Sequence, residues 1–514
     1  MKKITIILSV VVLFASCTKL DETVYDQIPS GEYFKTEEQV RGTLTTIYDE
    51  IRGDWGGKGY MGADRGWYDL NEISSDECMI PIRDGGSAWQ DGGIWVQTYR
   101  HEWTPSHPFV EQTWNWLYRA ISQCNQAIEL LEEKKANPQF IAEAKVLRAQ
   151  FYYMLMDGWG DVPIVTSTKT TVSEVVQSTR AEVFAFVEKE LKENVSNLSA
   201  NKSLYGRFTK GAGFAVMAKV YLNAQIYIGT PKWAEAIAVC DSIIGLNYSL
   251  VSGSQYFDKG SNGLFGDVCN SNEVIYAISV DATKNPRNIV GIRSLRFEHG
   301  QALTFGKVST WGGSTAHRDF IEKFQDEDIR KEQWVSNAKD RSGSTVQKAP
   351  AAGGGDLIYN LDIADIEDAG NFDGLRNIKF NIIAGYNGEG IGEINSGSAN
   401  NDFPVYRFAD ILLVKAEAIL RNGGSPADAV VYLNQVRNRA GLVNYPGVVT
   451  LEEIYDERGR ELCWEGLRRQ DMIRFGKYNT GHDFAPPSAS KYNLFPKAPN
   501  TLANNPKLTQ NPGY

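Results

Sequence analysis

A regular spacing of apolar side chains, three and four residues apart, constrains the fold of this 514-residue chain more than any other feature. Its clearest stretch consists of Val110, Trp114, Leu117, Ile121, Cys124, Ile128 and Leu131. This spacing puts all of these side chains on one face of an α-helix. The pattern resumes from Phe140 to Met154 after Asn137-Pro138, a pair of residues typical of a turn. The two segments therefore predict two antiparallel helices joined by a short connection.

Similar helical patterns recur along the chain. They cover residues 180–198, 212–228, 231–244, 408–421, 426–440 and 451–475. Pro231 stands where a first-turn proline is expected, and Gly441 is typical of a helix C-terminus. Helix pairs of about 34 residues are characteristic of tetratricopeptide repeats. We therefore expect a mainly α fold, in which tetratricopeptide-like helix pairs form a superhelical scaffold with long irregular loops and a few short strands, one of them at residues 274–280.

Two long segments, residues 52–108 and 245–404, lack the helical period and are rich in Gly, Ser, Asn and Asp. Long irregular segments of compact proteins commonly carry function. The first segment and the helix after it also concentrate tryptophan, with Trp55, Trp67, Trp89, Trp95, Trp103, Trp114 and Trp116. A loop tryptophan either packs in the core or offers an exposed ring, and the sequence leaves both alternatives open.

Charge and motifs exclude several classes of function. The formal net charge is −10 and no block of basic residues is present, so nucleic-acid binding is not expected. No phosphate-binding loop, nucleophile elbow or helical zinc motif is found, and no pair of carboxylates stands out as catalytic. We therefore predict a protein that is not an enzyme and needs no metal or other cofactor.

The N-terminus carries an export signal. Lys2 and Lys3 precede an apolar stretch that ends in Ala15-Ser16-Cys17, the arrangement of a secretory signal. A cysteine at the cleavage point is typical of bacterial lipoproteins, so we expect residues 1–16 to be removed and Cys17 to be lipidated. An ordinary secretory signal is the alternative. Pairing of Cys78 with Cys269 is left open by the sequence.

Several stretches are specific enough to suggest a family. They are RAQFYYMLMDGWGDVPIV at 148–165, GAGFAVMAKVYLNAQIY at 211–227, FPVYRFADILLVKAEAILRNGG at 403–424, ERGRELCWEGLRRQDMIRFGK at 457–477, and residues 74–105. In this order, after a lipoprotein signal, they resemble the SusD/RagB family of outer-membrane nutrient-binding lipoproteins. The resemblance implies three parts: the signal peptide at 1–16, an N-terminal SusD-like part at 17–245 with helical repeats and aromatic loops, and a C-terminal RagB/SusD part at 246–514 with a loop insertion and the final repeats.

The resemblance also implies a function. A SusD-like protein is anchored by its lipid in the outer membrane and faces the cell exterior. There it binds oligosaccharides and delivers them to a SusC-like TonB-dependent transporter. A RagB-type protein that captures peptides for the same partner is the main alternative. A surface glycosidase and a helical scaffold without a ligand are further alternatives.

Family members bind glycans through aromatic rings on loops, because the negative face of an indole attracts the C–H groups of a sugar ring. Arg and Asp side chains then hydrogen-bond the hydroxyl groups. We therefore expect a ligand-binding site that comprises Trp67, Arg83, Trp89, Asp91, Trp95, Arg296 and Trp311. This choice is a hypothesis about position. The sequence identifies neither the glycan nor any calcium ion held by loop aspartates.

Charged residues also recur at helical spacing between Glu457 and Arg474. Opposite charges three or four residues apart form pairs along a helix, and when buried they form networks that are costly to break. We interpret these residues, and Arg407, as structural rather than catalytic.

Overall fold

The computed structural model describes residues 37–53, 59–61, 64–256, 263–265, 271–280, 288–306, 308–380, 382 and 401–514. The predicted signal peptide, Cys17, Trp55 and Cys269 lie outside the described residues. The chain divides into two units, Met1–Thr43 and Leu44–Tyr514. Of the first unit, only residues 37–43 at the start of helix α3 (Glu37–Arg52) are described. Leu44–Tyr514 forms one compact unit. The division predicted near residue 245 lies within this unit and stays a prediction.

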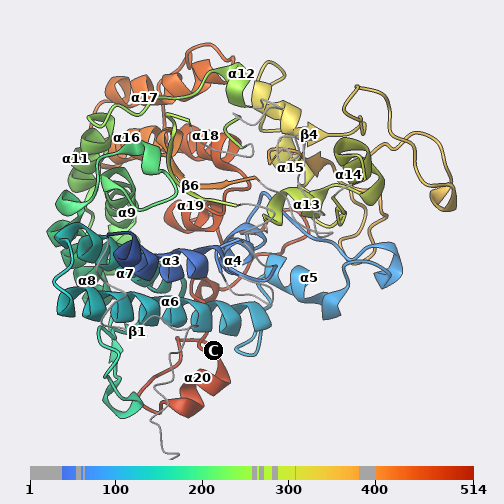
Figure 1. Ribbon diagram of the computed structural model, residues 1–514. Coiled ribbons are helices and arrows are strands. Elements are labelled where there is room, and N and C mark those ends of the chain that lie inside the picture. The colour runs from blue at the N-terminus through green and yellow to red at the C-terminus, as the bar shows by residue number, and fades with distance from the viewer. Residues whose placement is uncertain are drawn as a thin grey trace, which may run out of the picture. The chain divides into compact units, whose positions relative to one another are not determined.

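The first predicted helix pair is present as α6 (Pro108–Glu133) and α7 (Pro138–Trp159), which pack against each other (Figure 1). Each helix begins with a proline at its first turn, where the missing N–H costs no hydrogen bond. The Asn137 side chain caps α7 by accepting a hydrogen bond from the Gln139 N–H at 3.0 Å. The next helix, α8 (Arg180–Asn194), packs against α7.

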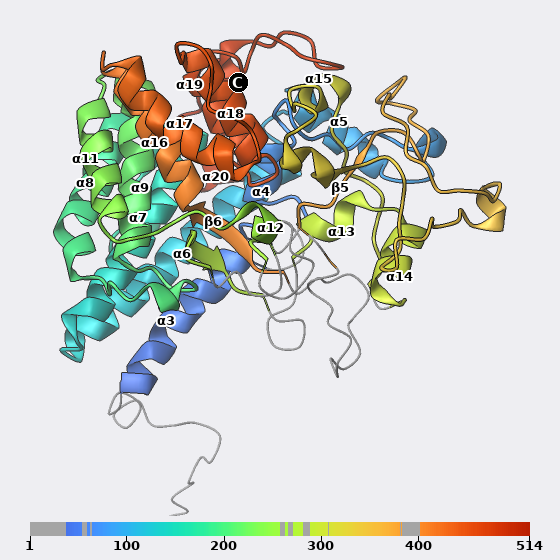
Figure 2. The same ribbon diagram turned by 90° about the horizontal axis from the view of Figure 1, so that it is seen from above.

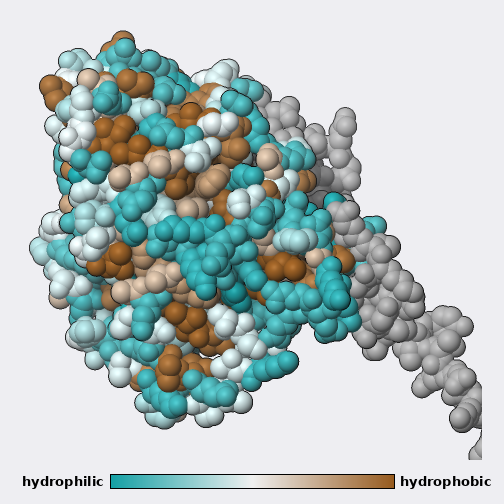
Figure 3. Space-filling view, turned by 90° about the vertical axis from the view of Figure 1, so that its left-hand side faces the viewer, coloured by the Kyte–Doolittle hydropathy of each residue, from teal (hydrophilic) through white to brown (hydrophobic). Residues whose placement is uncertain are grey.

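The stack continues with α9 (Lys210–Leu222) and α11 (Trp233–Ile244), and then with α16 (Phe408–Arg421) and α17 (Pro426–Arg439). Helix α16 packs against α11, α17 and α18 (Leu451–Leu462), so the helix pairs form a continuous array (Figure 1). This arrangement confirms the mainly α fold with tetratricopeptide-like helix pairs. On the face in Figure 3, hydrophobic residues form separate patches among hydrophilic ones.

Shorter elements make up the rest of the unit. The short helices are α4 (Trp67–Glu72), α5 (Ile94–Tyr99), α10 (Ala224–Ile228), α12 (Gly253–Tyr256), α13 (Val290–Ser294), α14 (Phe297–Thr304), α15 (Arg318–Ile321), α19 (Arg468–Arg474) and α20 (Pro499–Asn504). Figures 1 and 2 both show α5, α13, α14 and α15 together on the side away from α8 and α11. The two segments without helical period therefore lie side by side, joined by a bridge between Met79 and Thr315.

The described strands form three antiparallel pairs. They are β1 (Val162–Pro163) with β2 (Gln177–Ser178), β3 (Val274–Ile278) with β6 (Phe403–Arg407), and β4 (Trp334–Val335) with β5 (Arg376–Asn377). In the longest pair, Val274 lies opposite Arg407 and Ile278 lies opposite Phe403. This pair carries the strand expected at 274–280 and joins two segments far apart in the chain.

Three details of the predicted helices were wrong. The segment 451–475 is not one helix, because α18 ends at Leu462 and α19 begins at Arg468. Trp464 between them has a φ of +62°, and the buried Glu72 carboxylate accepts hydrogen bonds from its N–H at 3.2 Å and from the Gly466 N–H at 2.9 Å. These tertiary contacts override the local helical pattern.

The other two wrong details of the predicted helices lie between α9 and α11. The helix expected at 212–228 is interrupted at Asn223, which separates α9 from α10. Pro231 lies outside the first turn of α11, since Lys232 is its N-cap.

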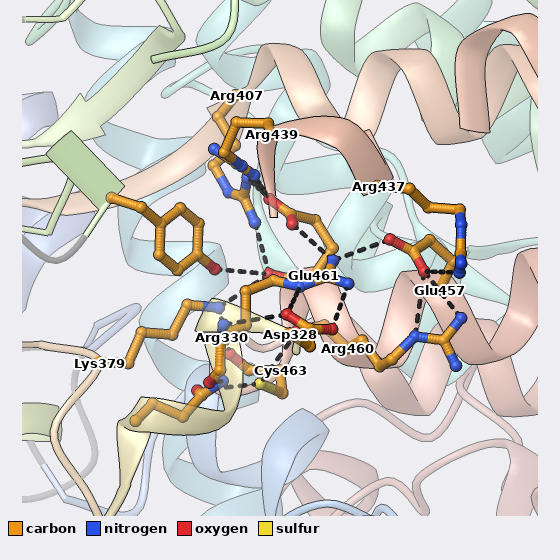
Figure 4. Close-up of polar contacts among 12 residues, drawn as sticks. Asp328, Arg330, Lys379, Arg407, Arg437, Arg439, Glu457, Arg460, Glu461 and Cys463 are labelled. Atoms are coloured by element: carbon orange, nitrogen blue, oxygen red, sulfur yellow. Dashed lines mark hydrogen bonds and ion pairs between the residues drawn. The ribbon is translucent and has the colours of Figure 1, made fainter. Parts of the chain in front are cut away.

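The predicted charge network is present and buried around Glu461 of α18 (Figure 4). The Glu461 carboxylate forms ion pairs with Arg407, Arg439 and Arg330, the last at 2.9 Å, and all four residues are buried. The guanidinium groups hold the pKa of this carboxyl well below its usual range, against the opposing effect of burial. We call these four residues the Glu461 cluster. It joins β6, α17, α18 and the segment after Asp328, which agrees with the structural interpretation of Arg407.

Candidate functional site

Two Asp-Gly-Gly turns, at Asp84–Gly86 and Asp91–Gly93, shape the loop that carries Trp89. Their glycines adopt positive φ, as at Gly85 (+62°) and Gly92 (+66°), which allows the chain to reverse twice within ten residues. Trp89 itself has a φ of +57° and its side chain is half-buried. The loop thus places one tryptophan ring at the surface between two tight turns.

Trp311, from the second loop segment, lies beside Trp89. The Trp89 Nε1–H donates to the Trp311 carbonyl at 2.9 Å, and the two ring centroids are 6.0 Å apart at an angle of 45°. A Cβ on Gly313 would lie 2.3 Å from Trp89 Cε2, so only glycine at this position allows the ring to pack there. Trp311 is half-buried and its ring packs on an apolar cluster that includes Ile292 and Leu295.

Arg296 and Phe372 extend this surface. The Arg296 guanidinium lies 5.4 Å from the Phe372 ring centroid and pairs with Glu298 at 3.3 Å. A Cβ on Gly312 would lie 3.2 Å from Arg296 Cδ, which places this arginine next to the Trp311 segment. We call Trp89, Trp311, Arg296 and Phe372 the aromatic platform; all four are half-buried. It offers ring faces together with a guanidinium, the two groups that a sugar ring needs.

Arg83 lies beneath the platform and does not reach its surface, contrary to the expected ligand contact. It is fully buried, and its guanidinium donates to the carbonyls of Gly370 (2.7 Å), Asp373 (3.0 Å) and Gly313 (3.1 Å). Burial, with Arg376 nearby, lowers its pKa. Arg83 thus ties together the three segments that carry Trp89, Trp311 and Phe372.

Trp95 is also buried, at 1% exposure, and is not open to a ligand. Its ring lies 5.9 Å from that of Trp89, and its Nε1–H donates to Asp91 at 2.8 Å. Asp91 is exposed at the edge of the platform and pairs with Arg65 at 3.3 Å. Trp95 therefore packs against Trp89 and is itself held by Asp91.

Trp67 is the one expected site residue that the structure places away from the others. Only 5% of it is exposed, and its ring lies at the end of α7, 3.4 Å from the point where a Cβ on Gly158 would lie. Its burial at the start of α4 is typical of a packing residue, and the ligand contact expected there stays a prediction.

Phe372 was missed in the sequence, although it stands in the loop AGNFDG, whose composition matches that around Trp89. Two further aromatic residues at the ends of α14 were also missed. Phe297 and Phe305 are 52% and 68% exposed. An aromatic residue among Gly, Asn and Asp was the signal that could have identified Phe372.

The described residues contain no group of three or more His, Cys, Asp or Glu side chains suited to a metal ion. Within the same part of the chain, no helix has the length and apolar character to cross a membrane. Cys78 is buried, and burial raises the pKa of its thiol.

Two family models match the chain. Residues 64–222 match the model described as "Starch-binding associating with outer membrane", and residues 241–514 match the model of the SusD family. Among curated proteins, the chain is similar to the starch-binding protein SusD of Bacteroides thetaiotaomicron. The two are 26% identical over 509 residues, which cover 89% of this chain and 87% of the relative. A SusD-like protein of Bacteroides ovatus is 23% identical over 93% of this chain and 83% of its own length.

Solved structures share the fold. A laminarin-binding SusD-like protein superposes with a TM-score of 0.72 at 23% identity, covering 94% of this chain and all of the other. Surface glycan-binding protein A from Bacteroides thetaiotaomicron, in complex with laminarihexaose, gives a TM-score of 0.71 at 20% identity, with 92% and 99% coverage. Because the SusD family model alone matches more than half of the residues, and the fold agrees, the chain belongs to the SusD family.

Proposed function

We propose that this protein is a cell-surface lipoprotein that binds oligosaccharides at the aromatic platform and delivers them to a SusC-like TonB-dependent transporter. The observation that carries the proposal is the pair of half-buried rings of Trp89 and Trp311, held 6.0 Å apart beside Arg296. The names of the relatives, which describe starch, laminarin and glycan binding, support it. In this function the protein binds its ligand without chemical change.

The platform would bind a glycan mainly by stacking. Each sugar ring placed on an indole contributes about 0.5–1.5 kcal/mol, by analogy with aromatic pairs. The Arg296 guanidinium and the Asp91 carboxylate would hydrogen-bond hydroxyl groups at the edge of the rings. A few such contacts give dissociation constants in the range of about 1 µM to 1 mM. Weak binding suits a protein that has to release its ligand to a transporter.

The proposed location rests on the N-terminus and on the family. A lipid on Cys17 would anchor the protein in the outer membrane, facing the cell exterior. The family description that mentions the outer membrane supports this placement. Copurification of the full-length protein with a TonB-dependent transporter from detergent-solubilised outer membranes would test the proposed partner.

Calorimetric titration of the chain from Thr18 onward, with plant, host and microbial oligosaccharides, tests ligand binding. We expect one glycan class to bind, and Trp89→Ala and Trp311→Ala each to weaken that binding about tenfold, equivalent to about 1.4 kcal/mol. Trp233→Ala is the matched control, because Trp233 is also half-buried but lies on α11. Equal affinity in all four proteins would exclude the platform as the site.

The same assay separates the alternatives. Binding of peptides, with no response to any glycan, would identify a RagB-type peptide-capturing protein. Release of reducing sugar ends would identify a glycosidase. Loss of stability in the platform variants, with no ligand bound by the unmodified protein, would identify a scaffold whose loops only pack.

A further inference from the structure

A second concave site lies between α6, the β1–β2 connection and α20, elements that Figure 1 shows next to one another below α7. Its volume is about 340 Å³, within the range of small-molecule sites. The apolar part of its lining includes Trp114, Tyr118, Val172, Val175 and Leu508. We call it the α6–α20 pocket. It shares no residue with the aromatic platform.

Three polar groups of the pocket form no hydrogen bond with the described residues and are open to a ligand. Trp114 is 95% buried, with 5% exposure, yet no hydrogen bond of its indole N–H is found among the described residues. The side-chain amides of Asn115 and Asn504, both exposed on the pocket wall, likewise form no hydrogen bond within the described part of the chain. The indole N–H is not among the fully buried side-chain groups that lack a partner, so it is open to the pocket and can donate to an acceptor on a ligand.

Other polar side chains of the pocket lining already form hydrogen bonds within the protein. The Asn500 amide donates to Glu111 Oε1 at 3.0 Å, so the carboxylate in the lining is partly satisfied. The Tyr118 hydroxyl donates to the Pro163 carbonyl at 2.9 Å, which fixes the ring. The rings of Trp114 and Tyr118 are 4.9 Å apart at 48° and form an aromatic wall.

The lining selects the chemical class of ligand. None of the described residues that line the pocket is Lys or Arg, so a phosphate, sulfate or uronate would find no counter-charge. A purely apolar ligand would cover the indole N–H without offering it an acceptor. Asparagine amides both donate and accept, as hydroxyl groups do, and aromatic rings pack against C–H faces. A neutral sugar ring meets all of these conditions.

We propose that the α6–α20 pocket is a second carbohydrate-binding site, which takes one neutral sugar ring. The Trp114 N–H would donate to a ring or hydroxyl oxygen, and Asn115 and Asn504 would pair with hydroxyl groups at the mouth. This site is independent of the platform. Two sites on one chain would hold a long polysaccharide more tightly than either alone, through the effective concentration that the first contact creates for the second.

Methyl NMR on protein labelled at Val and Leu methyl groups tests the pocket directly, because Val172, Val175 and Leu508 are reporters within its wall. The probes are glucose, galactose, xylose and N-acetylglucosamine, each titrated to about 50 mM, a concentration suited to millimolar affinity. The Trp89→Ala/Trp311→Ala double variant serves as the host, so that platform binding does not contribute. We expect at least one sugar to shift the three reporters with a single saturating curve.

Pocket variants complete the test. Asn115→Leu/Asn504→Leu removes both amides without removing bulk, and we expect it to weaken the response about tenfold or more. Asn438→Leu is the matched control, an exposed asparagine on α17 whose side chain has no partner among the described residues. The proposal is overturned if no sugar moves the reporters, or if the pocket and control variants respond alike. Failure of the platform itself would appear only in the Trp89 and Trp311 titrations, so the two outcomes are distinguishable.

Discussion

Replacing Glu461 by Gln tests whether the buried charge cluster stabilises the fold. Gln has nearly the same size as Glu, so the change removes charge without leaving a cavity. Glu461 is fully buried and forms ion pairs with Arg407, Arg439 and Arg330. Removing one partner of a buried ion pair costs about 3–5 kcal/mol, because uncompensated charge remains.

The structure places the expected cost at the lower end of this range. Each arginine of the cluster keeps another carboxylate, and these are Glu273, Glu465, Asp328 and Glu457. No guanidinium is therefore left alone, and we expect a loss of about 3 kcal/mol. With a urea m value of about 3 kcal/mol/M, the unfolding midpoint falls by about 1 M. Tryptophan fluorescence in urea, after circular dichroism has verified folding, measures the shift.

The pH dependence of stability gives a second test of the role of Glu461. The pKa of Glu461 is lowered in the folded protein, so its contribution is present above the unfolded pKa of about 4.3 and is lost as the pH falls below that value. The Glu461→Gln variant lacks this contribution and should lose less further stability on acidification. Glu322→Gln is the control, since its exposed carboxylate pairs only at the surface with Arg318. Equal midpoints for Glu461→Gln and Glu322→Gln at neutral pH would refute the reasoning.

Three further outcomes are expected. Gly313→Ala places a Cβ against the Trp89 ring, so glycan affinity should fall about tenfold, as in Trp89→Ala. Unchanged affinity in calorimetry would contradict the packing of the Trp89 ring on Gly313. Burial lowers the pKa of His101 to about 4, below its unfolded value of about 6.5, so this group binds fewer protons when folded and stability should fall as the pH drops between these values. Denaturant midpoints of His101→Gln should therefore show a shallower decline over this range, and an identical pH profile would exclude the effect. Cys17→Ser should abolish fatty-acid labelling and release the protein from the membrane fraction in cells, and a variant that is still labelled would show that another residue carries the lipid.

The helical scaffold could be predicted from the sequence because each helix carries its own pattern. The spacing from Val110 to Leu131 and the asparagine and proline before α7 are local signals, and α6 and α7 follow them within a few residues. The break between α18 and α19 could not be predicted this way. It depends on Glu72, almost 400 residues earlier in the chain, which hydrogen-bonds the backbone at Gly466.

The site was predicted only in part, because local patterns identify its loops but not the contacts between them. Loop composition identified the segment with Trp89 and the segment with Trp311, but it does not separate a ring that faces solvent from one that faces the core. Trp95 lies six residues from Trp89 and is buried against Phe109, with 4.8 Å between ring centroids. Arg83 was expected to contact the ligand because it stands in the same loop as Trp89. Its actual acceptors are backbone carbonyls of distant loops, and no side-chain pattern in the sequence reveals them.

The contacts at the α18–α19 break also limit recombination between members of the family. Glu72 and Asp76 belong to the region matched by the first family model, whereas their partners Gly466 and Arg468 belong to the region matched by the second. A chimera that joined the first region of this chain to the second region of a relative would bury two carboxyl groups opposite foreign residues. Recombination between family members near residue 230 is therefore expected to succeed only where the parent of the second region has an arginine at the position of Arg468 and no proline at that of Gly466.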